Sequence, residues 1–199
     1  MVDLFNHLRT LNLVGCSQLV LVQTSGSVQA NVYLFEYSHN KWEQVSEKPI
    51  AAVIGKQGMV EPGQKLEGDM KTPIGLYAIK QAFGTELIHS NMDFLHITAE
   101  DKWIDDVSSP NYNQHVKGEC DAKSFENMNR DTYQLGAVIE YNMNPVKPGA
   151  GSAIFMHIWK SPKTPTAGCV AMAKVDMKNV LIWLEQQKTP HILMMLTNQ

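Results

Sequence analysis

Short β-prone runs divided by turn-forming residues restrict the fold of this chain more than any other feature of its sequence. Most of the runs are rich in valine, isoleucine, leucine and aromatic residues, and each has the length of an ordinary strand. They lie at residues 18–22, 32–37, 42–45, 51–54, 75–79, 94–98, 137–141, 153–159 and 191–196. The small polar segment 24–29 predicts a hairpin turn between the first two runs.

Helical periodicity is clear in one segment only. Met177, Val180, Leu181 and Leu184 fall on one face of a helix that we predict over residues 174–187. A proline three residues after this segment prevents its continuation. Many strands and one helix predict a mainly β domain.

Two segments between the expected strands are too rich in breakers or polar residues to form regular elements. Residues 55–73 contain six glycines and prolines, and residues 105–131 are mostly polar. We expect both to be long loops. Loops of this length in a compact domain tend to be functional.

The overall composition favours one globular domain over residues 1–199. The 199 residues include no linker-like tract and no internal repeat. A formal net charge of −3 argues against nucleic acid as a partner. No window approaches the roughly 18 unbroken apolar residues of a membrane span. We expect a monomer.

The three cysteines, Cys16, Cys120 and Cys169, stand at spacings that match no zinc site, and the histidines form no metal-ligand pattern with them. We therefore expect no metal. In an oxidising compartment Cys16 and Cys120 are the pair expected to form a disulfide. The alternative is that both are reduced and buried.

A histidine and a cysteine near the C-terminal end are the candidate catalytic residues. His157 ends an apolar strand, and eleven residues that include two prolines lead from it to Cys169. A thiol with an ordinary pKa near 8.5 is mostly protonated at neutral pH, so a catalytic cysteine needs a neighbouring base. Gly168 lets the backbone approach a substrate, and we expect the amides of Gly168, Cys169 and Val170 to face a developing oxyanion. By itself the pair is also compatible with a core histidine and a small buried cysteine.

Four patterns, at residues 72–77, 103–113, 141–152 and 157–172, resemble a known family. His157 followed by Thr-Ala-Gly-Cys-Val-Ala-Met at 166–172 is similar to the signature of YkuD-type L,D-transpeptidases, in which a histidine precedes Ser/Thr-x-Gly-Cys. Thr-Pro-Ile-Gly-Leu-Tyr at 72–77 resembles their Thr-Pro-x-Gly-x-Tyr strand. Segments 103–113 and 141–152 resemble one branch of the family, and the whole resemblance covers about residues 18–187.

The resemblance implies a function, a mechanism and a fold. The expected enzyme is a peptidoglycan L,D-transpeptidase with a β-sandwich fold and one helix after the catalytic cysteine. Cys169 attacks the L,D bond of a tetrapeptide stem, releases D-alanine and passes the acyl group to an amine of a neighbouring stem. His157 is the base, and the backbone carbonyl of Ile158 holds its tautomer. Two alternatives remain: an L,D-carboxypeptidase that uses water, and a non-catalytic wall-binding module.

The family's pattern also has departures here. Many members have glycine, histidine and arginine where this chain has Ile158, Ala167 and Ala171, so the mode of stem recognition stays open. For substrate binding we expect contributions from four residues near the motif, namely Tyr141, Trp159, Thr166 and Val170. No cofactor is expected. Asp69 and Lys71 are expected to form an ion pair that orders the long loop.

Such an enzyme works in the periplasm or cell envelope. Residues 1–22 do not read as a signal peptide, because Asp3, His7 and Arg9 interrupt the apolar region it requires. Residues 13–16 are similar to a lipoprotein cleavage box, which we interpret as a chance match because the preceding segment is too polar. The export signal is therefore expected to be absent or trimmed.

Overall fold

The computed structural model describes residues 13 and 15–197, so most of the segment examined for a signal peptide lies outside the described residues. The described part is mainly β, which confirms the expected fold class. Its strands are β1 (Gln18–Thr24), β2 (Gln29–Ser38), β3 (Lys41–Gln44), β4 (Ile50–Val53), β5 (Met59–Val60), β6 (Thr72–Pro73), β7 (Gly75–Gly84), β8 (Asp93–His96), β9 (Asp101–Ile104), β10 (His115–Lys117), β11 (Phe125–Asn127), β12 (Gly136–Ile139), β13 (Phe155–Ile158), β14 (Val170–Met172) and β15 (His191–Leu196). One α-helix is described, α2 (Lys174–Trp183).

The main sheet closes on itself. Within the described residues its order is β1-β15-β7-β12-β13-β14-β4-β2-β3, and β1 also pairs with β2, so that eight strands complete a ring. β3 extends β2 beyond the ring as a hairpin, and β8 pairs with β7. The strands of the expected β-sandwich thus belong to one continuous sheet, and the sandwich arrangement itself stays a prediction.

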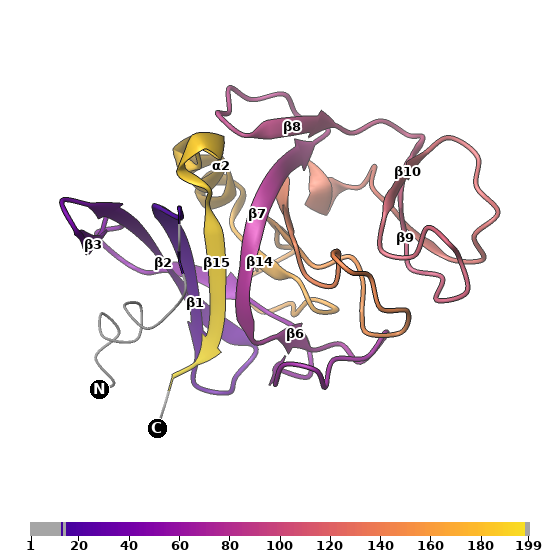
Figure 1. Ribbon diagram of the computed structural model, residues 1–199, viewed down its shortest axis with the longest axis horizontal. Helices are drawn as coiled ribbons and strands as arrows, with labels where there is room; N and C mark the ends of the chain where they lie inside the picture. Colours follow the sequence, from indigo (N-terminus) through magenta and orange to yellow (C-terminus); the bar gives the residue numbers. More distant parts are fainter. Residues whose placement is uncertain (1–12, 14, 198–199) are drawn as a thin grey trace.

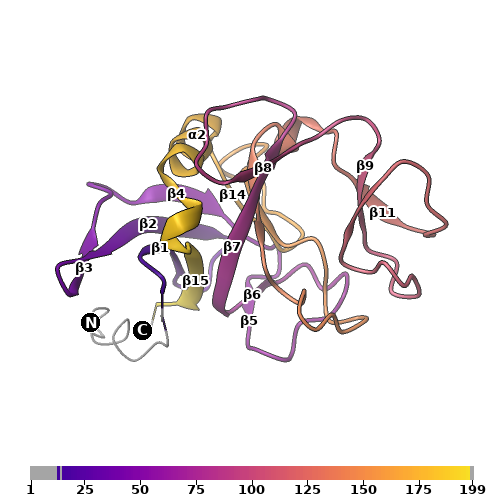
Figure 2. The same cartoon turned by 45° about the horizontal axis from the view of Figure 1, so that its top comes forward.

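A second, small sheet forms a lobe beside the main one. β9, β10 and β11 pair in the order β10-β9-β11, and Figures 1 and 2 show them on the side of the molecule opposite the β2–β3 hairpin. Segment 105–131 is thus not simply a loop. Its strands were missed because they are three residues long and largely polar, as His115–Lys117 and Phe125–Asn127 illustrate.

Alternation along β13 and β14 divides the core into two parts. Met156 and Val170 belong to the larger hydrophobic cluster, to which α2 contributes Met177. Phe155 and Cys169 belong to a second cluster, built with residues of the lobe and the segment after it. Helix and lobe therefore cover opposite faces of these two strands.

Element ends differ from the prediction where the backbone turns before the apolar pattern stops. The helix ends at Trp183 instead of 187, because Leu184 has extended backbone angles (φ −65°, ψ 136°), and a 3-10 turn follows at Gln186–Lys188. β7 continues to Gly84, five residues past the expected end. The breaker-rich segment 55–73 is mostly irregular, and its two short strands, β5 and β6, pair in parallel.

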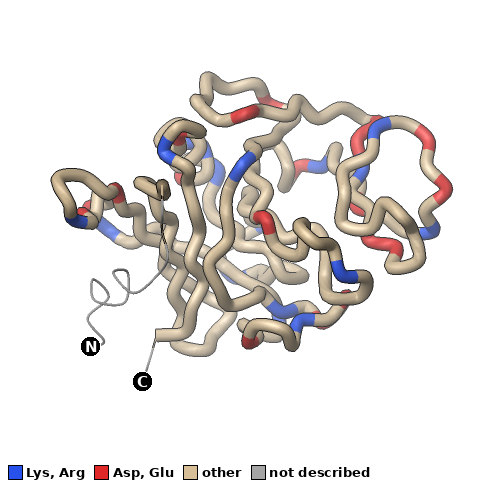
Figure 3. The backbone as a smooth tube through the Cα atoms, in the orientation of Figure 1, with Lys and Arg blue, Asp and Glu red and all other residues tan. Residues whose placement is uncertain are grey.

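All three cysteines are free. Cys16 is buried and its thiol donates a hydrogen bond to the Gln18 carbonyl at 3.2 Å, whereas Cys120 is only half-buried. Of the two alternatives for this pair, the reduced form is therefore present, but only Cys16 is buried. Figure 3 shows acidic and basic residues interspersed on the loops and the lobe, whereas much of the main sheet has none. No helix in the described part of the chain is long and apolar enough to cross a membrane.

Candidate active site

The neighbouring strands β13 and β14 bring His157 and Cys169 to one face of the sheet. In the parallel ladder His157 pairs with Ala171, and paired residues of adjacent strands point to the same face. Cys169 precedes Ala171 by two residues and so shares that face. The two residues thus occupy diagonal positions on one face of neighbouring hydrogen-bonded strands.

Both residues line a cavity of about 350 Å³ on this face of the sheet. Its walls come from the loop before β6, from the lobe and from the segment between β13 and β14. Among the lining residues are Lys65, Glu126, Tyr133, Trp159 and Ala167. A volume of this order suits a small peptide segment. Within the described residues no group of three or more His, Cys, Asp or Glu side chains is arranged to hold a metal ion.

The His157 ring is fixed by its surroundings and is neutral. It is 8% exposed, its Nδ1 lies 2.8 Å from the Ile158 carbonyl oxygen, and the Tyr133 ring packs edge-on against it at 5.1 Å between centroids. Because a carbonyl only accepts hydrogen bonds, Nδ1 carries the proton and Nε2 keeps its lone pair. Burial lowers the pKa of His157 to about 4. At neutral pH the imidazole is therefore a free base.

The Cys169 thiol is also neutral. Burial raises its pKa to about 12. Its sulfur receives the Phe155 amide N–H at 3.4 Å, and the thiol donates to the Ala153 carbonyl at 3.2 Å. Both candidate groups are thus neutral instead of forming a thiolate–imidazolium pair, and the thiol directs its proton at the Ala153 carbonyl oxygen.

A tight turn over residues 166–169 presents the cysteine. The Thr166 hydroxyl donates to the Cys169 carbonyl at 2.6 Å and accepts the Gly168 amide at 3.1 Å. Gly168 has a φ of +151°, and a Cβ there would lie 3.0 Å from the Lys71 carbonyl oxygen. Glycine is required here by the backbone angle and by the close packing of the Lys71 segment.

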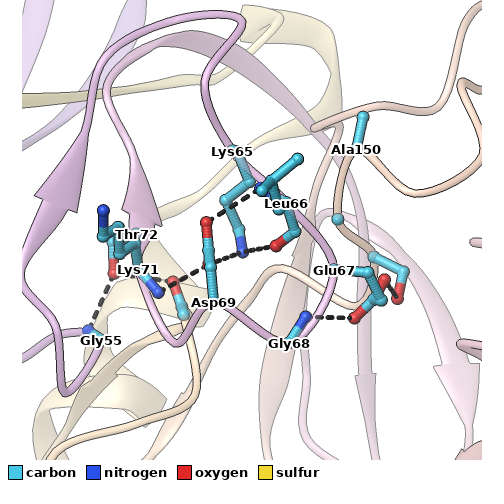
Figure 4. A network of polar contacts seen from close by, with 12 residues as sticks. Gly55, Lys65, Leu66, Glu67, Gly68, Asp69, Lys71, Thr72 and Ala150 are labelled. Carbon is cyan, nitrogen blue, oxygen red and sulfur yellow. Dashed lines mark hydrogen bonds and ion pairs between the residues drawn. The ribbon is translucent and has the colours of Figure 1, made fainter.

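Thr72 explains the Thr-Pro motif. Its buried hydroxyl donates to the Gly168 carbonyl at 2.7 Å and accepts the Gly55 amide at 2.9 Å, as Figure 4 shows for Gly55. With the Gly168 carbonyl held on Thr72, the trans peptide turns the Cys169 amide the opposite way. Of the three amides expected at an oxyanion hole, that of Gly168 is taken by Thr166 and Val170 lies in the β13–β14 ladder. The amide of Cys169 is therefore the candidate donor.

Replacing Thr72 by valine is expected to lower the free energy of unfolding by about 2 to 3 kcal/mol, because the variant leaves the buried Gly55 amide and Gly168 carbonyl without a partner. Urea denaturation measures the loss. Thr164→Val, at an exposed threonine, is the control and should stay within about 0.5 kcal/mol of the parent. Thr72→Ser keeps the hydroxyl and should recover most of the stability. Equal stability of Thr72→Val and the parent would contradict this role.

The loop before β6 is ordered by Asp69, but its partner is Lys65 and not Lys71. The buried Lys65 ammonium lies 2.6 Å from Asp69 Oδ1, and Lys71 contributes only its backbone amide, at 2.9 Å (Figure 4). The expected Asp69–Lys71 ion pair is therefore wrong. The same loop is attached to the opposite wall by Glu67, whose carboxylate accepts hydrogen bonds from the hydroxyl groups of Tyr112 and Ser152.

The four expected binding residues separate into two pairs. Trp159 and Thr166 line the cavity, although the Thr166 hydroxyl is engaged within its own turn. Val170 is fully buried in the cluster on the other face of β14, and Tyr141 packs on Tyr77 with its hydroxyl on the Ala150 carbonyl at 2.6 Å. Neither of these two lines the cavity. The position of Val170 could have been predicted from the sequence. It follows Cys169 directly, and neighbouring residues of a strand face opposite sides.

A polar group from the lobe was missed in the sequence. Glu126 lies 2.8 Å from Arg130 as an ion pair without hydrogen-bond geometry, and both line the cavity with Tyr133 and Asp105. Burial, reinforced by repulsion from Asp105, raises the pKa of Glu126. The i, i+4 spacing of Glu126 and Arg130 indicates an ion pair. Nothing in the sequence relates this pair to His157 and Cys169, which line the same cavity.

Comparison with known families supports the reading of the motifs. The model of the YkuD family, described as the L,D-transpeptidase catalytic domain, matches residues 21–193. The match spans most of the chain, includes both His157 and Cys169, and confirms the resemblance noted in the sequence. None of the curated proteins and none of the solved structures matches this chain significantly.

Proposed function

This chain belongs to the L,D-transpeptidase catalytic domain family, and from that premise we propose that it is a peptidoglycan L,D-transpeptidase with Cys169 as nucleophile and His157 as base. The observation that carries the proposal is the placement of these two side chains. They share one face of paired strands and open into one cavity, and the Ile158 carbonyl leaves His157 Nε2 unprotonated. Family membership supplies the substrate class, since the family acts on peptidoglycan peptides.

The first half of the proposed reaction begins from the neutral pair. The thiol leaves the Ala153 carbonyl, and its proton passes to His157 Nε2 as the sulfur attacks the carbonyl carbon of the L,D bond. The Cys169 amide stabilises the negative charge on the carbonyl oxygen. When the C–N bond breaks, the imidazolium returns the proton to the departing D-alanine nitrogen. A thioester with Cys169 remains.

The second half reverses the proton transfers. The amine of a neighbouring stem attacks the thioester carbon and gives a proton to His157, an amide bond forms, and the sulfur leaves as the thiol. The acidic residues Asp105 and Glu126 line this cavity together with the basic residues Lys65, Arg130 and Lys160, so the amine acceptor is proposed from family membership and not from the charge of the cavity. The cycle uses no cofactor, and one chain supplies all these groups. We accordingly propose a monomer in the periplasm or cell envelope, where the family typically resides.

Product analysis with the purified protein tests this function. Incubation with disaccharide-tetrapeptide is expected to yield cross-linked dimers and free D-alanine in equal amounts, measured by liquid chromatography and mass spectrometry. Cys169→Ala should form neither. Cys120→Ala is the matched control, because its thiol is half-buried and does not line the cavity, and it should keep full activity.

Two other results would contradict the proposal, and each would support a different function. Release of D-alanine without dimers indicates a carboxypeptidase. A third reading, the wall-binding module, follows if neither product forms and a carbapenem leaves the intact mass unchanged. We expect the carbapenem to add its full mass to the parent and to Cys120→Ala, and not to Cys169→Ala.

A further inference from the structure

Asn113 is a buried side chain of the lobe that uses its whole hydrogen-bonding capacity. It is 2% exposed and lies between β9 and β10. Its Oδ1 accepts the Trp103 indole N–H at 2.9 Å and the Ala153 amide at 3.0 Å. Its Nδ2 donates to the carbonyls of Tyr141 at 3.0 Å and Asn142 at 2.8 Å. An asparagine amide has two donors and two lone pairs, and all four are engaged.

The residue that Asn113 holds is in direct contact with the nucleophile. Ala153 has a φ of +53°, in the left-handed region that residues other than glycine rarely adopt. Its amide is bound by Asn113, and its carbonyl accepts the Cys169 thiol. Asn113, the left-handed residue Ala153 and the Cys169 thiol are thus linked by two consecutive hydrogen bonds, which form one chain of contacts.

From this chain of contacts we propose that Asn113 is a positioning residue for the nucleophile. By holding the left-handed backbone of Ala153, it keeps the carbonyl of that residue on the Cys169 thiol and so fixes the sulfur before attack. The inference rests on the proposed function, in which Cys169 is the nucleophile. Asn113 acts through Ala153 and does not itself line the cavity.

The two contacts of the sulfur depend differently on Asn113. Phe155 belongs to β13 and is held by pairing with β12, so its amide stays in place without Asn113. Ala153 precedes the strand, and we expect it to relax out of the left-handed region once its amide is released. The sulfur then keeps a donor that favours the thiolate and loses the acceptor that favours the thiol. The pKa of the thiol falls, while the position of the sulfur becomes less defined.

The test measures the reactivity of Cys169 separately from turnover. Alkylation by iodoacetamide is followed at each cysteine by peptide mass spectrometry as a function of pH. In Asn113→Ala the alkylation profile of Cys169 should shift down by about one pH unit, which corresponds to the net free energy of one hydrogen bond. The kcat for cross-linking should fall by about 10- to 100-fold with little change in KM, because the sulfur is misplaced. Asn111→Ala, at an exposed asparagine of the same loop, should change neither.

Two more variants keep the inference falsifiable. Adding Ala153→Gly to Asn113→Ala should recover part of kcat, because glycine adopts the left-handed conformation without help. Asn113→Asp keeps the oxygen that accepts the Ala153 amide, and its charge opposes thiol ionisation, so its profile should not shift downward. A downward shift as large as that of Asn113→Ala would overturn the inference, as would a folded Asn113→Ala with the profile of the parent.

Failure of the inference and failure of the proposed function give different results. If the parent forms no dimers but Asn113→Ala shifts the alkylation profile, only the transpeptidase proposal fails. If the parent forms dimers and Asn113→Ala alters neither the profile nor kcat, only the role of Asn113 fails.

Discussion

Replacing His157 by glutamine is expected to lower kcat for cross-linking by about 10²- to 10⁴-fold, the range that a positioned general base contributes. Glutamine is close in size and its amide can still donate to the Ile158 carbonyl, but it has no basic nitrogen. The comparison therefore removes the proton acceptor and largely preserves the packing against Tyr133. Initial rates of dimer formation measure the effect.

A second histidine provides a matched control. His191 Nδ1 also lies 2.8 Å from a backbone carbonyl oxygen, that of Thr189, but this contact is exposed and the residue does not line the cavity. His191→Gln should keep the kcat of the parent. Equal rates for His157→Gln and His191→Gln would rule out His157 as the base.

The pH profile gives an independent check on the same assignment. Because burial lowers the pKa of His157 to about 4 and raises that of Cys169 to about 12, neither group changes charge near neutral pH in the free enzyme. We expect kcat/KM to be nearly flat across neutral pH, with its acid limb near pH 4. The acid and alkaline limbs of the profile belong to the coupled pair of His157 and Cys169. An acid limb at pH 6.5 would show a solvated imidazole instead.

The sequence predicted most of the main sheet because its strands are apolar or alternate clearly. The run 191–196 is an example, and it became β15 with unchanged bounds. The lobe was missed for the opposite reason. β9, β10 and β11 are three or four residues long and largely polar, and their pairing is decided by contacts far apart in the chain.

At the candidate site, the sequence identified the proposed nucleophile and base and missed the residues that hold them in place. His157 and Cys169 were selected because their segment resembles the signature of a known family. Asn113 was seen only as part of a resemblance, since its side chain bonds residues up to forty positions later. Tyr141 was assigned to the cleft because aromatic residues suit binding sites, but its hydroxyl bonds the Ala150 carbonyl. The direction of a side chain depends on packing, which periodicity alone does not give.

The buried imidazole also predicts that the fold weakens in mild acid. In the unfolded chain His157 takes up a proton below its ordinary pKa of 6.5, whereas in the folded protein it does so only near pH 4. Between these values the unfolded state binds more protons, so the contribution is complete above pH 6.5 and is lost as the pH falls towards 4.

The pKa difference corresponds to a loss of about 3 kcal/mol in the free energy of unfolding over this range. Urea denaturation at a series of pH values measures it, and the slope against pH is the quantity to compare because glutamine also changes the absolute stability. His157→Gln should have a shallower slope by about one proton at its steepest, since its side chain does not titrate. His191→Gln is the control for replacing a histidine by glutamine elsewhere in the chain, and because it leaves the His157 imidazole in place its slope should be steeper than that of His157→Gln. Parallel curves for His157→Gln and the parent would mean that the imidazole takes up its proton at the same pH in the folded and unfolded states, which would contradict a pKa lowered by burial.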